Sequence, residues 1–217
     1  AKFVLTNNGN VELKEQIKLT RADGVTPISG KGNIPGVDEV PVTYTDAATD
    51  YTNADYTNAN NVNYHALPYD EFGGDFEGVL KDKNGDFWMC DEYRPAIYHF
   101  NDKGVLIKRY VAEGTSAKRW ANRGFEGIAY DEANHQIYAF IQSPMYNPSS
   151  STKNNSDVIR ILAIDANDGT PVAEYVFLLE RNRDSGFALS RTDKIGDAVY
   201  KGNGRFLVIE RDSEAQG

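Results

Sequence analysis

A motif that occurs twice, 49 residues apart, limits what this chain can fold into more than any other feature. The first copy begins with Asp75-Phe76-Glu77-Gly78-Val79 and the second with Gly124-Phe125-Glu126-Gly127-Ile128. In both copies a carboxylate stands at the start of a predicted strand and is followed by a glycine and apolar residues. A weaker third copy starts at Gly196-Asp197. Repeats of roughly 40–50 residues that each contain several short strands are typical of a β-propeller. We therefore predict an all-β fold of the propeller type.

Turn residues and apolar runs place the strands within this repeat. The first predicted blade has strands near 78–82, 87–91, 96–101 and 105–111, and the second has strands near 127–131, 136–142, 158–165 and 172–179. Half blades are predicted at 3–6 with 11–19 and at 197–201 with 205–210. Two full blades and two half blades are too few, because propellers typically have about 4–8 blades. We therefore expect residues 1–217 to form one incomplete domain, a fragment of a propeller of about five to seven blades.

Residues 20–75 form a long segment with little strand pattern. It contains a short tandem repeat, Tyr44-Thr45-Asp46-Ala47, Tyr51-Thr52-Asn53-Ala54 and Tyr56-Thr57-Asn58-Ala59. Segments this long are usually lids over a functional site or flexible insertions, and both interpretations stay open here. The nearby acids Asp46, Asp50 and Asp55 do not have the spacing of an EF-hand loop.

Charge and composition exclude several classes of partner. The formal net charge is −9 and the 23 Lys and Arg residues are not clustered, which argues against nucleic acids and anionic membranes. The sequence has no apolar run of 18 residues, so we predict no membrane span. The single cysteine, Cys90, lies in an apolar run, which excludes an internal disulfide and a multi-cysteine zinc site. We expect a buried, unreactive thiol.

Propeller geometry predicts that the carboxylates meet. The first strand of each blade lines the central channel, and loops that enter the first strand and leave the second open on the same face. This places Glu77, Glu126 and Asp197 around one rim, together with Asp91, Glu92, Gln142 and Glu210. Crowded carboxylates repel each other unless a proton or a cation lies between them. Oxygen ligands in irregular geometry favour Ca²⁺, and the predicted ligands are Glu77, Glu126, Asp197 and the amide of Asn122.

The rim also carries three arginines, Arg94, Arg123 and Arg211. Guanidinium groups bind anionic substrates through paired hydrogen bonds. The same arginines could instead pair with the rim carboxylates, so that the rim binds nothing, and this alternative stays open. The histidines, His65, His99 and His135, lie apart in the sequence without a Ser or Cys arrangement that suggests a catalytic triad. We interpret them as structural or solvated.

Four ordered motifs resemble one known family. They are Asp75-Phe76-Glu77-Gly78-Val79, the run from Phe87 to Ile97, the run from Asn122 to Ile128, and Phe206-Leu207-Val208-Ile209-Glu210-Arg211-Asp212. Together they resemble the phytase-like family, whose members are described as having esterase-like activity of phytase. The resemblance covers about residues 75–212. It implies a secreted or periplasmic bacterial propeller, longer than this chain, that hydrolyses phosphate or carboxylic esters. The Glu-Gly strand entries are also similar to those of calcium-dependent gluconolactonase-type propellers, in which a glutamate is a metal ligand.

The leading hypothesis is a calcium-dependent hydrolase of small anionic esters. Calcium would polarise the scissile oxygen, one of Asp91, Glu92 and Glu210 would be the general base, and the three arginines would bind the substrate. The expected partners are this substrate and the remaining blades of the same protein. One alternative is a non-catalytic extracellular binding or assembly module that uses residues 44–64 as its contact surface. Another is a lactonase.

Overall fold

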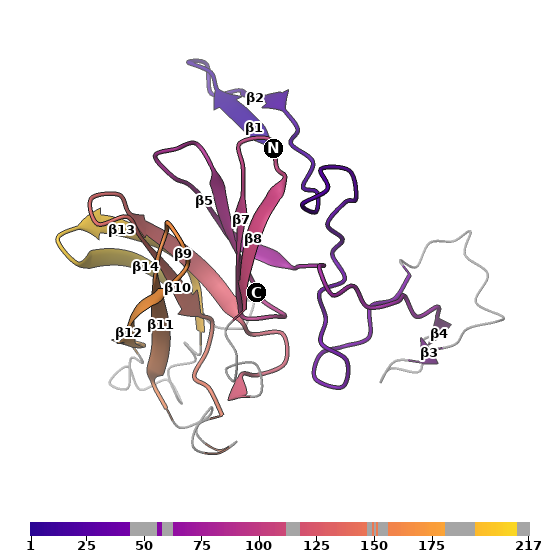
Figure 1. Ribbon diagram of the computed structural model, residues 1–217. Helices are drawn as coiled ribbons and strands as arrows, with labels where there is room; N and C mark the ends of the chain where they lie inside the picture. Colours follow the sequence, from indigo (N-terminus) through magenta and orange to yellow (C-terminus); the bar gives the residue numbers. More distant parts are fainter. Residues whose placement is uncertain are drawn as a thin grey trace.

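Antiparallel sheets account for the architecture of the computed structural model (Figure 1). It describes residues 1–43, 56–57, 63–111, 118–146, 149, 151, 156–180 and 194–211. The first sheet contains β5 (Phe76–Lys81), β6 (Phe87–Asp91), β7 (Ala96–Phe100) and β8 (Leu106–Val111). The second sheet contains β9 (Phe125–Asp131), β10 (Gln136–Ile141), β11 (Val158–Asp165) and β12 (Pro171–Leu178). In both sheets the strands lie side by side in chain order.

Three hairpins complete the strands in the described part of the chain. They are β1 (Lys2–Leu5) with β2 (Val11–Glu15), β3 (Tyr56–Thr57) with β4 (Asn63–Tyr64), and β13 (Lys194–Gly202) with β14 (Arg205–Arg211). The all-β prediction is therefore confirmed, and the strands of the two full sheets lie within a few residues of their predicted positions. The described ranges contain no helix long and apolar enough to cross a bilayer.

One predicted strand is too long. The sequence pattern predicted a strand over 11–19, but β2 ends at Glu15. The chain then leaves the hairpin, and Leu19 packs against the first sheet. Thr20 forms a parallel bridge to Val105 in the turn between β7 and β8. The apolar residues after Glu15 therefore serve a contact with another sheet, which local alternation cannot reveal.

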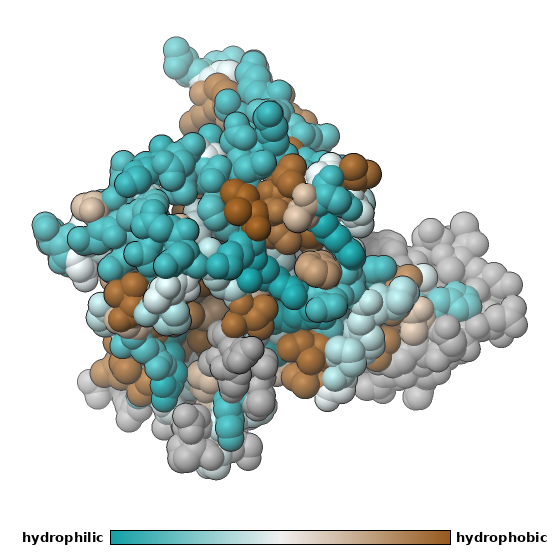
Figure 2. Space-filling model, in the orientation of Figure 1, coloured by the Kyte–Doolittle hydropathy of each residue, from teal (hydrophilic) through white to brown (hydrophobic). Residues whose placement is uncertain are grey.

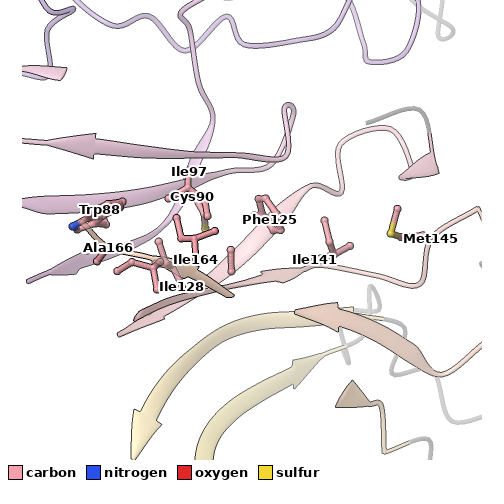
Figure 3. Packing of buried hydrophobic residues seen from close by; sticks show 11 residues of the cluster. Trp88, Cys90, Ile97, Phe125, Ile128, Ile141, Met145, Ile164 and Ala166 are labelled. Atoms are coloured by element: carbon pink, nitrogen blue, oxygen red, sulfur yellow. The ribbon is translucent and has the colours of Figure 1, made fainter. Parts of the chain in front are cut away.

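The main core lies between the two four-stranded sheets (Figure 3). It joins side chains of the first sheet to side chains of the second, namely Trp88, Cys90, Ile97, Phe125, Ile128, Ile137, Ala139, Ile141 and Ile164. A second cluster joins the other face of the second sheet to the β13–β14 hairpin. Cys90 is fully buried, and burial raises the pKa of its thiol, which confirms the prediction of a buried cysteine that does not ionise readily.

The glycines of the repeated motif allow the first strands to approach each other. β9 packs between β5 and β13. A Cβ added at Gly78 would lie 2.8 Å from Ile128 Cγ2 and 2.9 Å from Cys90 Sγ, and one at Gly127 would lie 3.0 Å from the backbone nitrogen of Ala198. Glycine therefore follows the repeated glutamate because a side chain there would push neighbouring sheets apart.

The described parts of the 20–75 segment are an integral layer of the fold. Ile28 and Phe72, with Leu19 just before the segment, cover the face of the first sheet that points away from the second. Within the segment, the carboxylate of Asp70 accepts hydrogen bonds from Arg21 at 2.8 Å and from Ser29 at 2.6 Å. The described residues of the segment therefore pack on the first sheet, and the interpretation of the whole segment as a lid or a flexible insertion stays a prediction. The acids Asp46, Asp50 and Asp55 lie outside the described residues.

A buried ion pair ties the same segment to the loop before β9. Arg119 Nη2 lies 2.8 Å from Asp38 Oδ2, and both side chains are fully buried. Asp38 also accepts hydrogen bonds from the backbone nitrogens of Ile34 at 2.7 Å and Asn122 at 3.0 Å. The segment therefore reaches the strand ends that carry the predicted site.

Exposed apolar side chains remain on the strands at the margins of the fold. On the β13–β14 hairpin they are Val199, Leu207 and Ile209, and on β5 Val79 is also exposed. The face shown in Figure 2 is largely hydrophilic, with separate hydrophobic patches. The two full sheets and the hairpin are compatible with successive propeller blades. The number of blades and the closure of a ring stay predictions.

Candidate active site

Glu77 and Glu126 owe their equivalent positions to irregular strand pairing. In β5, the pairing register with β6 shifts between Phe76 and Val79. In β9, the register with β10 shifts between Phe125, which pairs with Ile141, and Gly127, which pairs with Phe140. Each glutamate is the residue at the shift. Such β-bulges redirect a side chain and are common beside functional sites. The same shift occurs in β13, between Ile195 and Asp197.

The ends of the second strands meet through backbone hydrogen bonds. Within the first sheet, Glu92 N donates to Asp75 O at 3.0 Å, and within the second, Gln142 N donates to Gly124 O at 2.8 Å. Between sheets, Gly124 N donates to Glu92 O at 2.6 Å. Ile195 N then donates to Gln142 O at 2.9 Å and links the β13–β14 hairpin. This chain of bonds fixes the relative positions of the side chains at the rim.

Three carboxylates of the first sheet form a compact group, called the acidic group below. Asp75, Glu77 and Glu92 each offer an oxygen, and these oxygens lie within 4.8 Å of one another. Glu92 is only 8% exposed. Its burial and, to a smaller extent, the charges of Glu126, Glu77 and Asp75 raise its pKa to about 8. Burial followed by neighbouring carboxylates also raises the pKa of Glu77 and of Asp75. The group therefore favours either protons or a cation.

Glu126 lies beside the acidic group in a different environment. Its Oε1 lies 2.7 Å from Arg211 Nη2, and its Oε2 accepts a hydrogen bond of 2.5 Å from Gln142 Nε2. The residue is 3% exposed. Each oxygen of this predicted calcium ligand therefore accepts a hydrogen bond from a protein donor, and one of these donors carries a positive charge.

The other two predicted ligands, Asp197 and Asn122, have different surroundings. Asp197 is exposed, and its carboxylate accepts a hydrogen bond of 2.7 Å from the next backbone nitrogen, Ala198 N. The strand register places Gly196 at the position of Glu126, and Asp197 at the position of Gly127. Asn122 adopts a φ of 54° in the loop before β9, and its buried Oδ1 accepts no hydrogen bond from the described residues.

Only one of the three predicted general bases lies in the acidic group, namely Glu92. Asp91 is fully buried and accepts hydrogen bonds from the backbone nitrogens of Tyr93 at 2.9 Å and Arg94 at 3.3 Å, while burial raises its pKa to about 7. It shapes the turn after β6. Glu210 accepts a bond of 2.9 Å from the backbone nitrogen of Glu180, and burial raises its pKa. Its contact is with the end of the second sheet.

The three arginines also have different surroundings. Arg94 donates to the backbone oxygens of Gly32, Asp70 and Glu71, so it fastens the 20–75 segment to the first sheet. The guanidinium of Arg123 lies 4.0 Å above the ring of Trp120 and donates to Ser143 Oγ at 2.9 Å. The side chain of Arg211 is 45% exposed while it pairs with Glu126. The structure therefore gives Arg94 a structural contact and leaves Arg211 partly accessible at the rim.

The histidine contacts agree with the structural interpretation. His99 stacks on Trp88 at 3.9 Å, and its Nε2 lies 3.0 Å from Asp86 Oδ2. Asp82, Asp86 and His99 also place potential ligand atoms within 4.8 Å of one another. However, Asp82 already accepts hydrogen bonds from Asn84, Asp86 and Trp88 in the hairpin between β5 and β6. His135 Nδ1 lies 2.6 Å from Tyr130 Oη.

Comparison with known proteins places the chain in a family. The family described as "Phytase-like: Esterase-like activity of phytase" matches residues 2–217. The chain belongs to the phytase-like family. This phytase-like chain is also similar to an "Uncharacterized secreted protein" of Arthroderma benhamiae, with 26% identity over 264 residues. The similarity covers 96% of this chain and 47% of the relative, so the chain spans about half the length of that relative. The relative is fungal and gives no support for the bacterial source that the resemblance implied.

Some residues of the candidate site were not among the predicted site residues. Asp75 stood within the repeated motif, but its counterpart in the second copy is Gly124. Propeller geometry placed Gln142 at the same rim as Glu92, but no sequence pattern assigned it a role in the site. Glu39 carries no local signal. It accepts a hydrogen bond from Tyr93 Oη, and its charge, after the larger effect of burial, helps raise the pKa of Asp75.

Proposed function

We propose that this phytase-like chain is the metal-binding part of a secreted hydrolase of phosphate or carboxylic esters, with calcium held by the acidic group. The observation that carries the proposal is the contrast in charge at the rim. Three carboxylate oxygens lie within 4.8 Å of one another. Among the described residues, no Lys or Arg forms an ion pair with Asp75, Glu77 or Glu92, whereas Glu126 beside them is paired with Arg211.

The donor set suits calcium. All the donors are oxygens, and calcium accepts carboxylate and amide oxygens in flexible geometry. The buried Oδ1 of Asn122, which accepts no hydrogen bond from the described residues, supports the earlier prediction that this amide oxygen takes part. Of the predicted ligands, the proposal keeps Glu77 and Asn122, adds Asp75 and Glu92, and assigns Glu126 to a supporting contact.

When bound, calcium would supply a Lewis acid for the ester oxygen and for an attacking water. The chain would supply proton transfer and substrate binding. Glu39 is exposed and held by Tyr93, and it lies close enough to Asp75 to affect its pKa. Glu39 is therefore our candidate proton acceptor. Arg211 and Arg123 are the candidate partners of the anionic part of the substrate.

We also propose that the two full sheets and the β13–β14 hairpin are successive blades of a larger propeller. The apolar residues Val199, Leu207 and Ile209 of the hairpin are more than half exposed, as expected for a strand pair that packs against a further blade. The secreted relative, about twice as long as this chain, supports both the additional blades and an extracellular location.

The test is a hydrolase assay, with and without calcium, of the purified protein that contains this chain and the further blades proposed for it. Substrates are phytate, 4-nitrophenyl phosphate, 4-nitrophenyl acetate and a δ-lactone, which includes the lactonase alternative. We expect turnover of at least one ester that stops with a chelator, returns with calcium and is lost in Glu77→Gln. The matched control is Glu174→Gln on β12, which removes one charge of an exposed ion pair with Arg160 of β11.

Two results would contradict the proposal. Hydrolysis that continues in the chelator and in Glu77→Gln would exclude a calcium centre at the acidic group. Calcium binding without turnover of any substrate would favour the binding-module alternative. Thermal unfolding of each variant in the chelator would separate a lost site from a lost fold.

A further inference from the structure

Gln142 stands at the centre of the rim and is held by its backbone on two sides. Its N–H donates to Gly124 of its own sheet and its carbonyl accepts from Ile195 of the β13–β14 hairpin. The residue is 3% exposed. Its side chain therefore starts from a fixed point between three strand ends and loses little further freedom when it forms hydrogen bonds.

The amide nitrogen of Gln142 joins the two glutamates that lie on either side of it. It donates to Glu92 Oε1 at 2.9 Å and to Glu126 Oε2 at 2.5 Å. The two hydrogens of one amide nitrogen can each serve one acceptor. One oxygen of Glu92 is thereby anchored, and the other oxygen is left for a further partner. Both oxygens of Glu126 are occupied once Arg211 is included.

Strand register shows that three residues occupy equivalent positions with different charges. Asp91 pairs with Phe76, Ile141 with Phe125 and Glu210 with Ile195, so the residues that follow are equivalent. These are Glu92, Gln142 and Arg211. The position is therefore negative in the first sheet, neutral in the second and positive in the β13–β14 hairpin. The charge changes stepwise along the rim.

We propose that Gln142 is a positioning residue that orients Glu92 within the acidic group and keeps Glu126 out of it, and so confines calcium to the first sheet. This inference rests on the calcium site proposed above. A neutral donor at this position satisfies both glutamates without adding a charge that would compete with the cation. A carboxylate here would extend the acidic cluster toward Glu126, and a guanidinium would neutralise it.

Calcium titration calorimetry of the full 217-residue chain tests the role of Gln142. Gln142→Met keeps the side-chain length and removes the donor, and Gln142→Arg introduces the group that the equivalent Arg211 carries. The matched control is Gln136→Met at the other end of β10, where Gln136 accepts a bond from Tyr138 Oη. We expect Gln142→Met to raise the calcium dissociation constant about 10- to 100-fold, as for other residues that orient metal ligands. Gln142→Arg should abolish measurable binding, and Gln136→Met should bind as the wild type does.

A merely structural role would give a different pattern. If the role of Gln142 were only structural, Gln142→Met would unfold at a lower temperature in chelator, but calcium would still raise its thermal midpoint as much as in the wild type. Our inference expects that increase to shrink or vanish. Wild-type affinity in folded Gln142→Met or Gln142→Arg would overturn the inference and leave the calcium site standing. A wild-type chain that binds no calcium would overturn both.

Discussion

The first and second sheets place glutamates at the same backbone position and give them different polar neighbours. Glu77 faces Asp75 and Glu92, and burial and neighbouring negative charges raise its pKa. Glu126 faces Arg211 and Gln142, which occupy both of its oxygens. A repeated motif therefore fixes where a carboxylate lies, while the residues across the sheet and on the next strand pair decide what it can bind.

The largest expected difference between the two sheets is in calcium affinity. Glu77→Gln should raise the calcium dissociation constant at least about 100-fold, because it removes a charged ligand. Glu126→Gln should change it by less than about 3-fold, because Glu126 acts outside the first coordination shell. Isothermal titration of both variants gives the comparison directly. Equal losses in the two variants would show that Glu126 is a ligand as well, as the sequence had predicted.

The glycines of the two motifs should differ in how far they tolerate a side chain. Gly78→Ala places a Cβ against Ile128 and Cys90 in the core and should lower the free energy of unfolding by about 2–3 kcal/mol. Gly127→Ala meets mainly the backbone of β13 and should cost about 1–2 kcal/mol. Gly30→Ala, with open space around its added Cβ, is the control. Urea unfolding measures all three, and a neutral Gly78→Ala would mean that the sheets can separate at no cost.

The ion pair between Glu126 and Arg211 should contribute less to stability than the close packing at Gly78, because it is partly solvated. Arg211→Met leaves the buried Glu126 with Gln142 as its donor among the described residues and should lower the free energy of unfolding by about 1–2 kcal/mol, since Arg211 is 45% exposed. Adding Glu126→Gln to Arg211→Met should recover part of that loss. A double-mutant cycle by urea unfolding measures the coupling. Additive effects of the two substitutions would show that the pair contributes nothing.

The smallest expected effect comes from a feature that the two sheets share. Asp82 and Asp131 begin the hairpins between the first and second strands. Burial acts to raise the pKa of each, but side-chain and backbone hydrogen bonds outweigh it, and both pKa values are lowered. Since the folded pKa lies below the unfolded value of 3.8, the stabilisation is present above about pH 4 and is lost as the pH falls through the folded pKa.

Asp82→Asn and Asp131→Asn should therefore each lower stability at pH 7 by about 0.5–1 kcal/mol. The difference from the wild type should shrink as the pH falls below 4. Urea unfolding at pH 7 and pH 3 checks this, with Asp102→Asn in the turn between β7 and β8 as the control. A deficit that is independent of pH would assign the effect to packing instead of charge.

Much of the fold followed from the sequence, because strand pairing here is local. Each hairpin joins neighbours in the chain, so alternating apolar residues and turn residues such as Asn84-Gly85 and Asn203-Gly204 predicted the strands of both sheets and of the β13–β14 hairpin. The long 20–75 segment was harder to interpret. Its contacts, such as Asp38 with Arg119 and Phe72 on the first sheet, join residues far apart in the chain and leave no periodic pattern.

The sequence by itself determined the repeat, the all-β class and the presence of Glu77 and Glu92 at one rim. The tertiary structure decided how the charges are distributed there. In the structure Asp75 belongs to the acidic group, Glu126 pairs with Arg211, and Asp91 is buried in a turn. Asp197 lies at the position that Gly127 has in the second sheet. The physical reason is that a carboxylate's chemistry depends on donors and charges a few ångströms away. In this chain those neighbours come from other strands, and bulges in the strand register select them.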